Sequence, residues 1–374
     1  MKIIFFSIAI LSVFFLIYPY AVYPILLRLI PARYPLRDSN CKLSATLVFC
    51  AYNEGAVMAE KIANIELLKQ RHPDLEVLAF DDGSSDDTYD QLSARPDLIK
   101  VVQGGGRNGK ANGMKRLAAL AKGEILIFTD ANVLLKEDAL DNLFAWYADP
   151  TVGGVCGSLK YLGADESATA SVGGLYWRLE ERLKSDESRT GNVMGADGSI
   201  FSIRRELYPE FPDTVLDDLT VSMAVVFSGK RLIKVEDVVA FERLVAVRKE
   251  EFSRKVRISA RAYHTHLFLF PQLMKMNMLD KFKYFSRKLV RWFGGLFLIS
   301  GFFSTLVFVA LVSPMFAVFL SVAFALIAFM ALRVNKGFIG SVAEIVLALF
   351  ATLLGVYRAM KGHTVVVWSP AKSR

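Results

Sequence analysis

The chain has 374 residues, of which 53% are hydrophobic and 22% charged, and its mean hydropathy is +0.35. This length accommodates one full-sized globular domain and several membrane spans, but hardly two large domains. The formal net charge is +8, yet the basic residues gather beside apolar blocks and form no basic patch interleaved with aromatic residues, so nucleic acid is not an expected partner. The three cysteines form no CxxC pair and have no zinc-ligand spacing, which favours free thiols in a reducing compartment.

An apolar block opens the chain and runs from Met1 to Ile30. It continues past Pro19 without a small-residue cleavage pattern, so we expect an uncleaved transmembrane anchor over residues 1–32, with a secretory signal peptide as the weaker alternative. Basic residues follow this block and precede the next one: Arg28, Arg33, Arg37, Lys281, Lys283, Arg287, Lys288 and Arg291. The positive-inside rule therefore places the region between the two blocks in the cytoplasm, in a multi-pass protein of the cell (inner) membrane.

Apolar blocks return near the C-terminus, and residues 292–357 are predicted to form transmembrane or re-entrant helices. Three blocks are each close to the roughly 20 residues that cross a bilayer: Trp292–Val312, Pro314–Leu332 and Phe338–Val356. The third block contains Glu344, and a full crossing would leave the basic tail, residues 358–374, outside the cytoplasm. Both features favour a re-entrant or interfacial third helix.

Residues 40–250 have the composition of a soluble α/β domain. Four apolar, β-branched runs are predicted strands: Leu43–Cys50, Leu75–Phe80, Ile99–Val102 and Glu124–Thr129. Helical periodicity follows the first of them, over Val57–Leu68. Such alternation predicts a Rossmann-like, mostly parallel sheet covered by helices, with its ligand site at the carboxyl ends of the strands.

Polar or glycine-rich segments follow each of these strands. They are Ala51–Glu54, Asp81–Thr88, Gln103–Gly113 and Asp130–Asn132. Any one of them has a purely structural explanation, because Asp-Gly-Ser-Ser is good turn chemistry and Ser85 or Asp86 would cap the next helix. Since all of them fall where the sheet would place a ligand, the series favours a binding site.

The glycine-rich segment fits two nucleotide-binding motifs incompletely. A GxGxxG pattern is formed by Gly104, Gly106 and Gly109. These glycines follow the third strand, whereas a dinucleotide-binding motif follows the first. The same stretch ends in Lys110 and spells most of a P-loop, but Ala111 stands where a P-loop needs a hydroxyl to hold magnesium. A P-loop nucleotidase is therefore the weaker alternative.

The tripeptide Asp130-Ala131-Asn132 resembles the Asp-x-Asp element of enzymes that use nucleotide sugars. In that element, oxygen ligands hold a divalent cation against the diphosphate of the donor. Asp130 and Asn132 are therefore the predicted metal ligands, and Mg²⁺ or Mn²⁺ is the predicted cofactor, although Asn132 supplies only a neutral oxygen.

With these residues in view, the chain from about Leu43 to Arg261 resembles the inverting family 2 glycosyltransferases. The membrane arrangement resembles the branch that includes cellulose, chitin, hyaluronan and poly-N-acetylglucosamine synthases. The resemblance implies a GT-A fold and transfer of a hexose or N-acetylhexosamine, with inversion, from a UDP-sugar to a saccharide or lipid-linked acceptor. It also implies polysaccharide or glycolipid synthesis in contact with membrane lipids, with room for accessory export or synthase subunits.

The resemblance assigns most of the candidate site. Residues expected to bind the nucleotide sugar are Ala51, Tyr52, Asn53, Glu54, Asp82, Lys110, Asp130 and Arg257. The segment expected under the donor sugar and acceptor is Gly195-Ala196-Asp197-Gly198, followed by the pair Arg204-Arg205. Trp177 is a further candidate for stacking on a sugar, although an amphipathic helix more often buries a tryptophan.

The catalytic carboxylate is expected in Asp217-Asp218. Inverting transfer needs a base that takes the proton of the acceptor hydroxyl, and Asp218 is the predicted base. The two carboxylates would alternatively cap the helix that begins near Leu219, or Asp217 would cap it while Asp218 does the chemistry.

Residues 251–291 are predicted to form basic interfacial helices. Within them, Arg254–Ile258 aligns with the Gln-x-x-Arg-Trp motif of processive synthases and retains Arg257, which would stabilise the leaving diphosphate. The motif's glutamine and tryptophan are absent, so the sequence leaves open whether a polymer is made or a single sugar transferred. The rival from another class is a catalytically degenerate scaffold or saccharide-export component.

Overall fold

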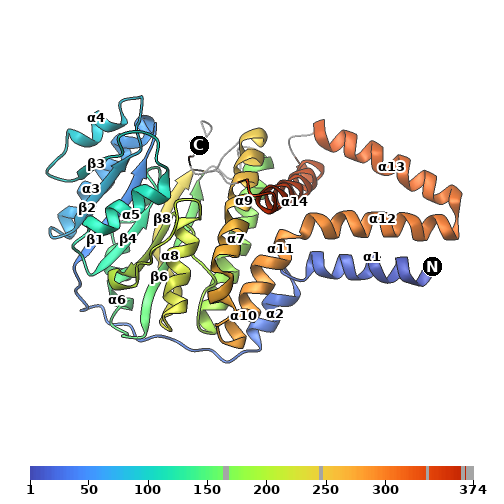
Figure 1. Cartoon of the computed structure of the whole chain (residues 1–374), viewed down its shortest axis with the longest axis horizontal. Coiled ribbons are helices and arrows are strands. Elements are labelled where there is room, and N and C mark those ends of the chain that lie inside the picture. The colour runs from blue at the N-terminus through green and yellow to red at the C-terminus, as the bar shows by residue number, and fades with distance from the viewer. Residues whose placement is uncertain (163–167, 244–246, 334–336, 364–366, 368–374) are drawn as a thin grey trace.

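A mixed eight-stranded sheet forms the centre of the domain (Figure 1). The computed structural model of the chain describes residues 1–162, 168–243, 247–333, 337–363 and 367. The sheet order is β3-β2-β1-β4-β7-β6-β8-β5. The strands are β1 (Ala45–Ala51), β2 (Glu76–Asp81), β3 (Lys100–Gln103), β4 (Ile125–Thr129), β5 (Leu134–Leu135), β6 (Val152–Leu162), β7 (Ile200–Arg204) and β8 (Arg231–Arg243).

The four strands predicted from sequence are all present, and each begins and ends within two residues of its predicted bounds. They pair in parallel, as predicted, in the order β3-β2-β1-β4. The other half of the sheet is mixed, because β7 runs antiparallel to β4 and β6, while β8 runs parallel to β6. The fold is a GT-A, Rossmann-like arrangement, which confirms the predicted fold class.

Helices cover both faces of the sheet. The helices of the domain are α3 (Gly55–Arg71), α4 (Thr88–Ser93), α5 (Lys110–Leu120), α6 (Ala139–Trp146), α7 (Ala168–Arg189) and α8 (Asp217–Phe227). Successive β1 side chains point to opposite faces: Phe49 joins one core with α3 and α6, and Val48 joins the other with α5 and α8. Strands that are buried on both faces explain the nearly continuous apolar runs in the sequence.

The topology brings the loops after β1, β2, β3 and β4 to one edge of the sheet. Parallel strands β1, β2 and β4 end there, and so do β6 and β8. Because β7 is antiparallel to β4, the segment that precedes β7 lies at this same edge. Residues 195–198 are thereby placed beside Asp130, which follows β4.

The N-terminal apolar block consists of two helices where one anchor was expected. Helices α1 (Lys2–Ile17) and α2 (Val22–Arg28) are bent by 56° to each other. Pro19 lies in the break, where its missing N–H and its ring disfavour a continuous helix. Whether this bent pair crosses a membrane as one span stays a prediction.

The described residues after β8 are mostly helical, and part of this helical region extends away from the sheet (Figure 1). It contains α9 (Arg248–Leu273), α10 (Met278–Tyr284), a π-helical turn η2 (Phe285–Leu289), α11 (Val290–Trp292), α12 (Gly294–Val312), α13 (Pro314–Arg333) and α14 (Gly337–Met360). Among the described residues, two helical stretches are long and apolar enough to cross a membrane, namely Gly294–Val312 and Ile339–Met360, or three if the bent α1–α2 pair counts as one span.

Helix α14 packs along α9 and also contacts α7, whereas α1 and α12 run side by side (Figure 1). Its Glu344 is buried and pairs with Arg248 at the start of α9. This ion pair explains how an otherwise apolar helix accommodates a carboxylate, since a buried charge is tolerated when it is paired. The close packing on α9 fits the expected interfacial placement of the last block, which stays a prediction.

Candidate active site

The loop that ends in Lys110 is fixed from beneath by Asp82. The Asp82 side chain is fully buried and accepts hydrogen bonds from the backbone N–H groups of Asn108 and Gly109, at 2.7 and 3.0 Å. It also pairs with the Arg107 guanidinium at 3.3 Å. Gly109 has φ +88°, a conformation that favours glycine. Asp82, predicted to contact the nucleoside, thus holds the loop that presents Lys110.

The loops after β1 and β2 are tied together by Asn53. Its side chain accepts a hydrogen bond from the Ser85 N–H at 2.8 Å, and its N–H donates to the Ser84 hydroxyl at 3.0 Å. Asn53 has φ +51°, a left-handed conformation that asparagine tolerates better than most residues. The neighbouring Glu54 is buried, and its N–H donates to the Thr88 hydroxyl at 2.9 Å.

The half-exposed Tyr52 carries a stacked guanidinium. Arg107 lies 3.2 Å from the centre of the Tyr52 ring. A planar stack at the mouth of the site is suited to a nucleobase, because aromatic rings and guanidinium planes both stack on bases. Ala51 is the buried last residue of β1, so its backbone supports this loop and its side chain faces the core.

Lys110 stands among three carboxylates at the centre of the site. Its ammonium nitrogen lies 2.6 Å from Asp130 Oδ1 and 3.9 Å from Asp217 Oδ2. Gly198 lies against the same group: a Cβ on it would be 2.9 Å from Lys110 Nζ, 3.5 Å from Asp218 Oδ2 and 3.9 Å from Asp130 Oδ2. Residues from four separate segments therefore meet around Gly198.

Burial and charge set the protonation of this cluster. Burial alone would lower the pKa of Lys110, but Asp130, Asp217 and Asp218 outweigh it and raise that pKa above its usual value. Burial and the neighbouring Asp217 raise the pKa of Asp218 to about 6, against the opposing charge of Lys110. A carboxylate with a raised pKa is a stronger base while it is still ionised at neutral pH.

Asp217 and Asp218 lie at the start of helix α8 and have different surroundings. Helix α8 begins at Asp217, and its N-cap position is occupied by Leu216, with no side-chain capping bond. Asp218 accepts a hydrogen bond from the N–H of the adjacent Leu219 at 2.6 Å, and Asp217 is buried facing Lys110. Neither carboxylate occupies the N-cap position, but both lie in the first turn of the helix, and the catalytic role of Asp218 stays a prediction.

The predicted metal motif has a carboxylate neighbour that the sequence did not reveal. The Asn132 amide donates to Glu242 Oε1 at 3.0 Å, and the Ser199 hydroxyl donates to Glu242 Oε2 at 3.4 Å. Glu242 lies near the end of β8, beside the segment that follows Gly198. It escaped prediction because β8 comes over 100 residues after Asn132 and carries no motif of its own.

The donor set fits a hard divalent cation. Asp130, Asn132 and Glu242 offer only oxygen and amide groups, which suit Mg²⁺ or Mn²⁺. Across the residues that the structure describes, no three His, Cys, Asp or Glu side chains lie close enough together to hold a metal ion. Magnesium sites commonly use one or two carboxylates completed by substrate phosphates, so this set fits a cation bound together with a diphosphate.

The turn that carries Asp130 rests on a buried lysine. The Lys61 ammonium donates to the backbone carbonyls of Asp130 and Val133, at 3.0 and 2.6 Å, and the side chain is fully buried. Burial lowers the pKa of Lys61 to about 7. A positioning role for this residue could not be read from the sequence, because Lys61 is one of two lysines on helix α3 and lies in no motif.

The segment predicted under the sugar is held by the protein at several points. Gly195 adopts φ +94°, and the Ala196 N–H donates to the Ser222 hydroxyl at 2.9 Å. Asp197 pairs with the buried Lys184 at 2.5 Å. Burial would raise the pKa of Asp197, but Lys184 reverses the effect and lowers it. The ion pair with Lys184 thus holds Asp197 in place, while Gly198 faces Asp218 and Asp130.

Comparison with known proteins agrees with this geometry. Residues 46–211 match the family described as Glycosyl transferase family 2. These residues therefore form a family 2 glycosyltransferase domain. The match ends before Asp217 and does not assign any residue a role, so the roles of all the predicted site residues stay predictions.

Curated relatives match part of the chain. It is 26% identical over 125 residues to the glycosyltransferase GlyG of Streptococcus pneumoniae, a match that covers 33% of this chain and 40% of GlyG. It is 24% identical over 225 residues to the O-antigen chain rhamnosyltransferase RfbN of Salmonella typhimurium, covering 57% and 70% of the two chains. The chain thus spans less than half the length of GlyG.

A solved structure matches nearly the whole chain. The mannosyltransferase PcManGT of Pyrobaculum calidifontis, solved in complex with GDP-Man and Mn²⁺, superposes with a TM-score of 0.75 at 22% identity. The match covers 95% of this chain and 98% of that one. At this identity the likeness supports the fold, and it extends over the helices beyond the family 2 domain.

Helix α9 contacts the segment that leads into Asp217. Arg261 is almost fully buried and donates to the Val215 carbonyl at 2.7 Å. One turn later, the Thr265 hydroxyl accepts from the Leu216 N–H at 2.8 Å. Arg257 lies one turn before Arg261 on this helix, and its side chain also interacts with other residues of the protein. The sequence singled out Arg257 but missed Arg261 and Thr265, whose partners lie 46 and 49 residues away.

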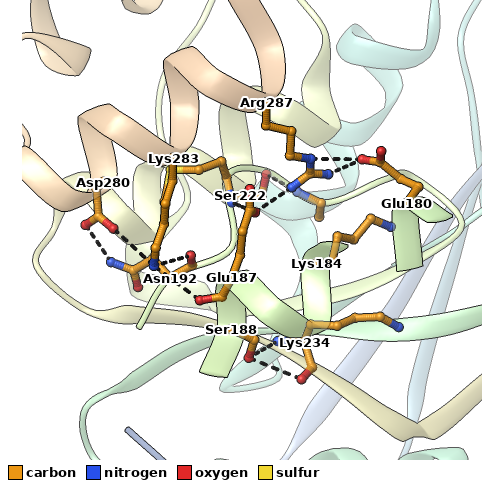
Figure 2. A network of polar contacts seen from close by, with 12 residues as sticks. Glu180, Lys184, Glu187, Ser188, Asn192, Ser222, Lys234, Asp280, Lys283 and Arg287 are labelled. Carbon is orange, nitrogen blue, oxygen red and sulfur yellow. Dashed lines mark hydrogen bonds and ion pairs between the residues drawn. The ribbon is translucent and has the colours of Figure 1, made fainter. Parts of the chain in front are cut away.

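A buried charge network joins the same domain to the helices near the apolar blocks (Figure 2). Arg287 pairs with Glu180 and, at 2.7 Å, with Glu187, and all three side chains are buried. Glu187 also accepts from the Met194 N–H at 2.9 Å and from the Tyr23 hydroxyl at 2.7 Å. The network therefore connects α2, α7 and η2 to the segment that leads into Gly195.

Trp177 is held by the protein. Its indole N–H donates to the Leu159 carbonyl at 2.9 Å, its ring meets Tyr161 edge to face, and Lys184 lies 4.4 Å from the ring centre. Arg204 likewise donates to the carbonyls of Val152 and Tyr147. These contacts account for both side chains structurally, and sugar stacking by Trp177 stays an untested prediction.

Proposed function

We propose that the chain is a membrane glycosyltransferase that transfers a sugar with inversion from a nucleotide-sugar donor to a saccharide or lipid-linked acceptor. The observation that carries this proposal is the meeting of Lys110, Asp130 and Asp218 around Gly198 at the carboxyl edge of the sheet. The ammonium of Lys110, the candidate metal ligand Asp130 and the proposed base Asp218 therefore lie close together. Two relatives that share part of the chain are named as glycosyltransferases, which supports the same reaction class.

Each group has a distinct part in the transfer. Asp218 accepts the proton of the acceptor hydroxyl as that oxygen forms a bond to the anomeric carbon. The bond from the anomeric carbon to the β-phosphate oxygen breaks, and its electron pair leaves with the nucleoside diphosphate. The Lys110 ammonium stabilises the negative charge on this leaving group, and a hydrogen-bonded cation in a partly buried site does so effectively.

Asp130 is the proposed principal metal ligand, with Asn132 and Glu242 completing the set from the protein. When bound, Mg²⁺ or Mn²⁺ would neutralise part of the diphosphate charge. The Tyr52–Arg107 stack is placed to hold the nucleobase, and Asp82 holds the loop that carries Arg107 in position. The presence of Mn²⁺ in the PcManGT structure supports a metal-dependent donor site here.

The proposed location is the cell membrane, with the domain on the cytoplasmic side. Two long apolar helices, the bent α1–α2 pair and the basic residues beside them support it. A UDP-sugar follows only from the family resemblance, and PcManGT was solved with GDP-Man. The donor base is therefore to be decided by a panel containing both nucleotides.

Release of nucleoside diphosphate tests the proposal. The full chain, purified with native lipid extract, is incubated with a panel of UDP- and GDP-sugars, with Mg²⁺, with Mn²⁺ or with chelator. We expect release from at least one donor that depends on the metal and on the extract. Absence of release from every donor would favour the degenerate scaffold, whereas equal hydrolysis of free ATP would favour the nucleotidase.

A further inference from the structure

A cavity lies where the bent N-terminal helix pair meets the domain. It has a volume of about 180 Å³ and lies between the α1–α2 break, α2, α7 and α11. Apolar side chains, including Ile25 and Leu179, form part of its wall, and three arginines reach it: Arg28, Arg182 and Arg291. None of these residues belongs to the group around Gly198, so this is a second site.

The cavity adjoins an exposed apolar surface. Ile25 and Leu179, which line the cavity, are 59% and 43% exposed. Along the same two helices follow Leu29, 76% exposed, and the exposed Leu175 and Tyr176. Exposed apolar surface next to a charged cavity is the arrangement that an amphiphile requires, with its polar head in the cavity and its chain on the surface.

The arginines differ in how far they are engaged within the protein. Arg291 is committed to Glu180 at 2.6 Å and to the Tyr176 hydroxyl at 2.6 Å. Arg28 is half exposed and lies 3.6 Å from Asp186. Arg182 is exposed, and within the described part of the chain it has no hydrogen bond or ion pair. The two carboxylates at the cavity, Glu180 and Asp186, each face an arginine, so Arg182 provides an unbalanced positive charge.

We propose that this cavity binds the headgroup phosphate of an anionic phospholipid from the surrounding bilayer. Guanidinium groups bind phosphate oxygens in a planar, two-point geometry, and Arg28 and Arg182 have donors to spare. An anionic headgroup is preferred to a zwitterionic one because the ammonium of a choline would meet these arginines. The inference rests on the proposed membrane location and is independent of the proposed chemistry.

Lipid binding here would be linked to the active site through shared residues. Glu180 lines the cavity and belongs to the network of Figure 2, and Arg291, which also lines the cavity, pairs with Glu180. That network continues through Arg287 to Glu187, which holds the Met194 N–H. A lipid that orders this corner therefore stabilises the segment leading to Gly195.

Native mass spectrometry of the delipidated full chain in detergent tests the proposal. The protein is titrated with phosphatidylglycerol and phosphatidylcholine of matched acyl chains. We expect the anionic lipid to bind at least about tenfold more tightly, because the choline ammonium of the other lipid would place a like charge close to the arginines, at a cost of about 1.4 kcal/mol or more. The double variant Arg28→Gln/Arg182→Gln should lose this preference. Arg178→Gln is the matched control, because Arg178 is exposed on α7 and does not line the cavity.

Equal binding of the two lipids by the wild-type chain would overturn the proposal. So would loss of the preference in Arg178→Gln to the same extent as in the double variant.

A nucleotide-sugar panel is then added to the lipid-bound protein. Bound phosphatidylglycerol should keep its mass, whereas a gain of one sugar mass would mean that the cavity holds the acceptor. The lipid titration measures binding alone, so it tests the cavity even if the protein shows no glycosyl transfer.

Discussion

Replacing Lys110 with methionine should shift the pH dependence of activity, because Lys110 opposes the protonation of Asp218. Lys110 Nζ and Asp218 Oδ2 lie 2.9 and 3.5 Å from the same point, the Cβ position of Gly198, so they are at most about 6 Å apart. Two unit charges at this distance interact by about 0.7–3 kcal/mol for effective dielectric constants between water and a protein surface. That energy corresponds to about half a unit to two units in the pKa of Asp218.

The base must be ionised to act, and the pKa of Asp218 is about 6 in the intact cluster. Activity of the wild-type chain should therefore fall as the pH drops through about 6. In Lys110→Met, which removes the positive charge, the acid limb of kcat/KM should move to higher pH and the overall rate should fall. Initial rates of nucleoside diphosphate release, from pH 5 to 9 at fixed metal concentration, measure both effects.

Lys115→Met is the matched control. Lys115 lies on the same helix and pairs with Asp213 at 2.5 Å, outside the cluster around Gly198. Its replacement should leave the acid limb where it is in the wild-type chain. An acid limb that is unmoved in Lys110→Met, or equally moved in both variants, would refute the electrostatic account of Asp218.

Three further variants test other parts of the structure. Asp82→Asn should weaken donor binding, seen as a raised KM, because the Lys110 loop loses a charged acceptor for two N–H groups, each worth about 1.5–3 kcal/mol; an unchanged KM would contradict this. Glu242→Gln should raise the Mn²⁺ concentration for half-maximal activity about 10-fold or more, as expected for loss of a ligand or of a group that orients one, and Glu236→Gln, near the middle of β8, should not. Arg287→Met should lower the free energy of unfolding by about 3–5 kcal/mol, because Glu180 and Glu187 remain buried; a thermal melt equal to that of Arg178→Met would exclude this.

The sequence predicted the parallel half of the sheet and the loops that follow it. This was possible because β1, β2 and β4 are buried on both faces and stand out as apolar runs ended by polar residues. The antiparallel insertion of β7 could not be predicted, because strand order depends on pairing between distant segments. That insertion is what brings Gly198 against Lys110.

The residues that sequence reasoning missed share one property. Lys61, Glu242, Arg261 and Glu187 act on partners that are distant in the chain, and none lies in a recognisable motif. The burial of a charged side chain cannot be predicted from the sequence while its ion-pair or hydrogen-bond partner is unknown. Asp82 and Asn53 were predicted to bind the nucleotide sugar, which stays a prediction, and their side chains hold the loops of the candidate site together.

Mass spectrometry of the product tests the central claim most directly, namely that Asp218 is the base of a transfer from a nucleotide sugar. Wild-type chain, Asp218→Asn and the control Asp213→Asn are incubated with native lipid extract and a nucleotide-sugar panel. We predict one or more products heavier by whole sugar units for the wild type and the control. In Asp218→Asn the rate should fall by about 10²–10⁴-fold, the usual contribution of a general base. Equal product from Asp218→Asn, or none from the wild type with any donor, would contradict the account.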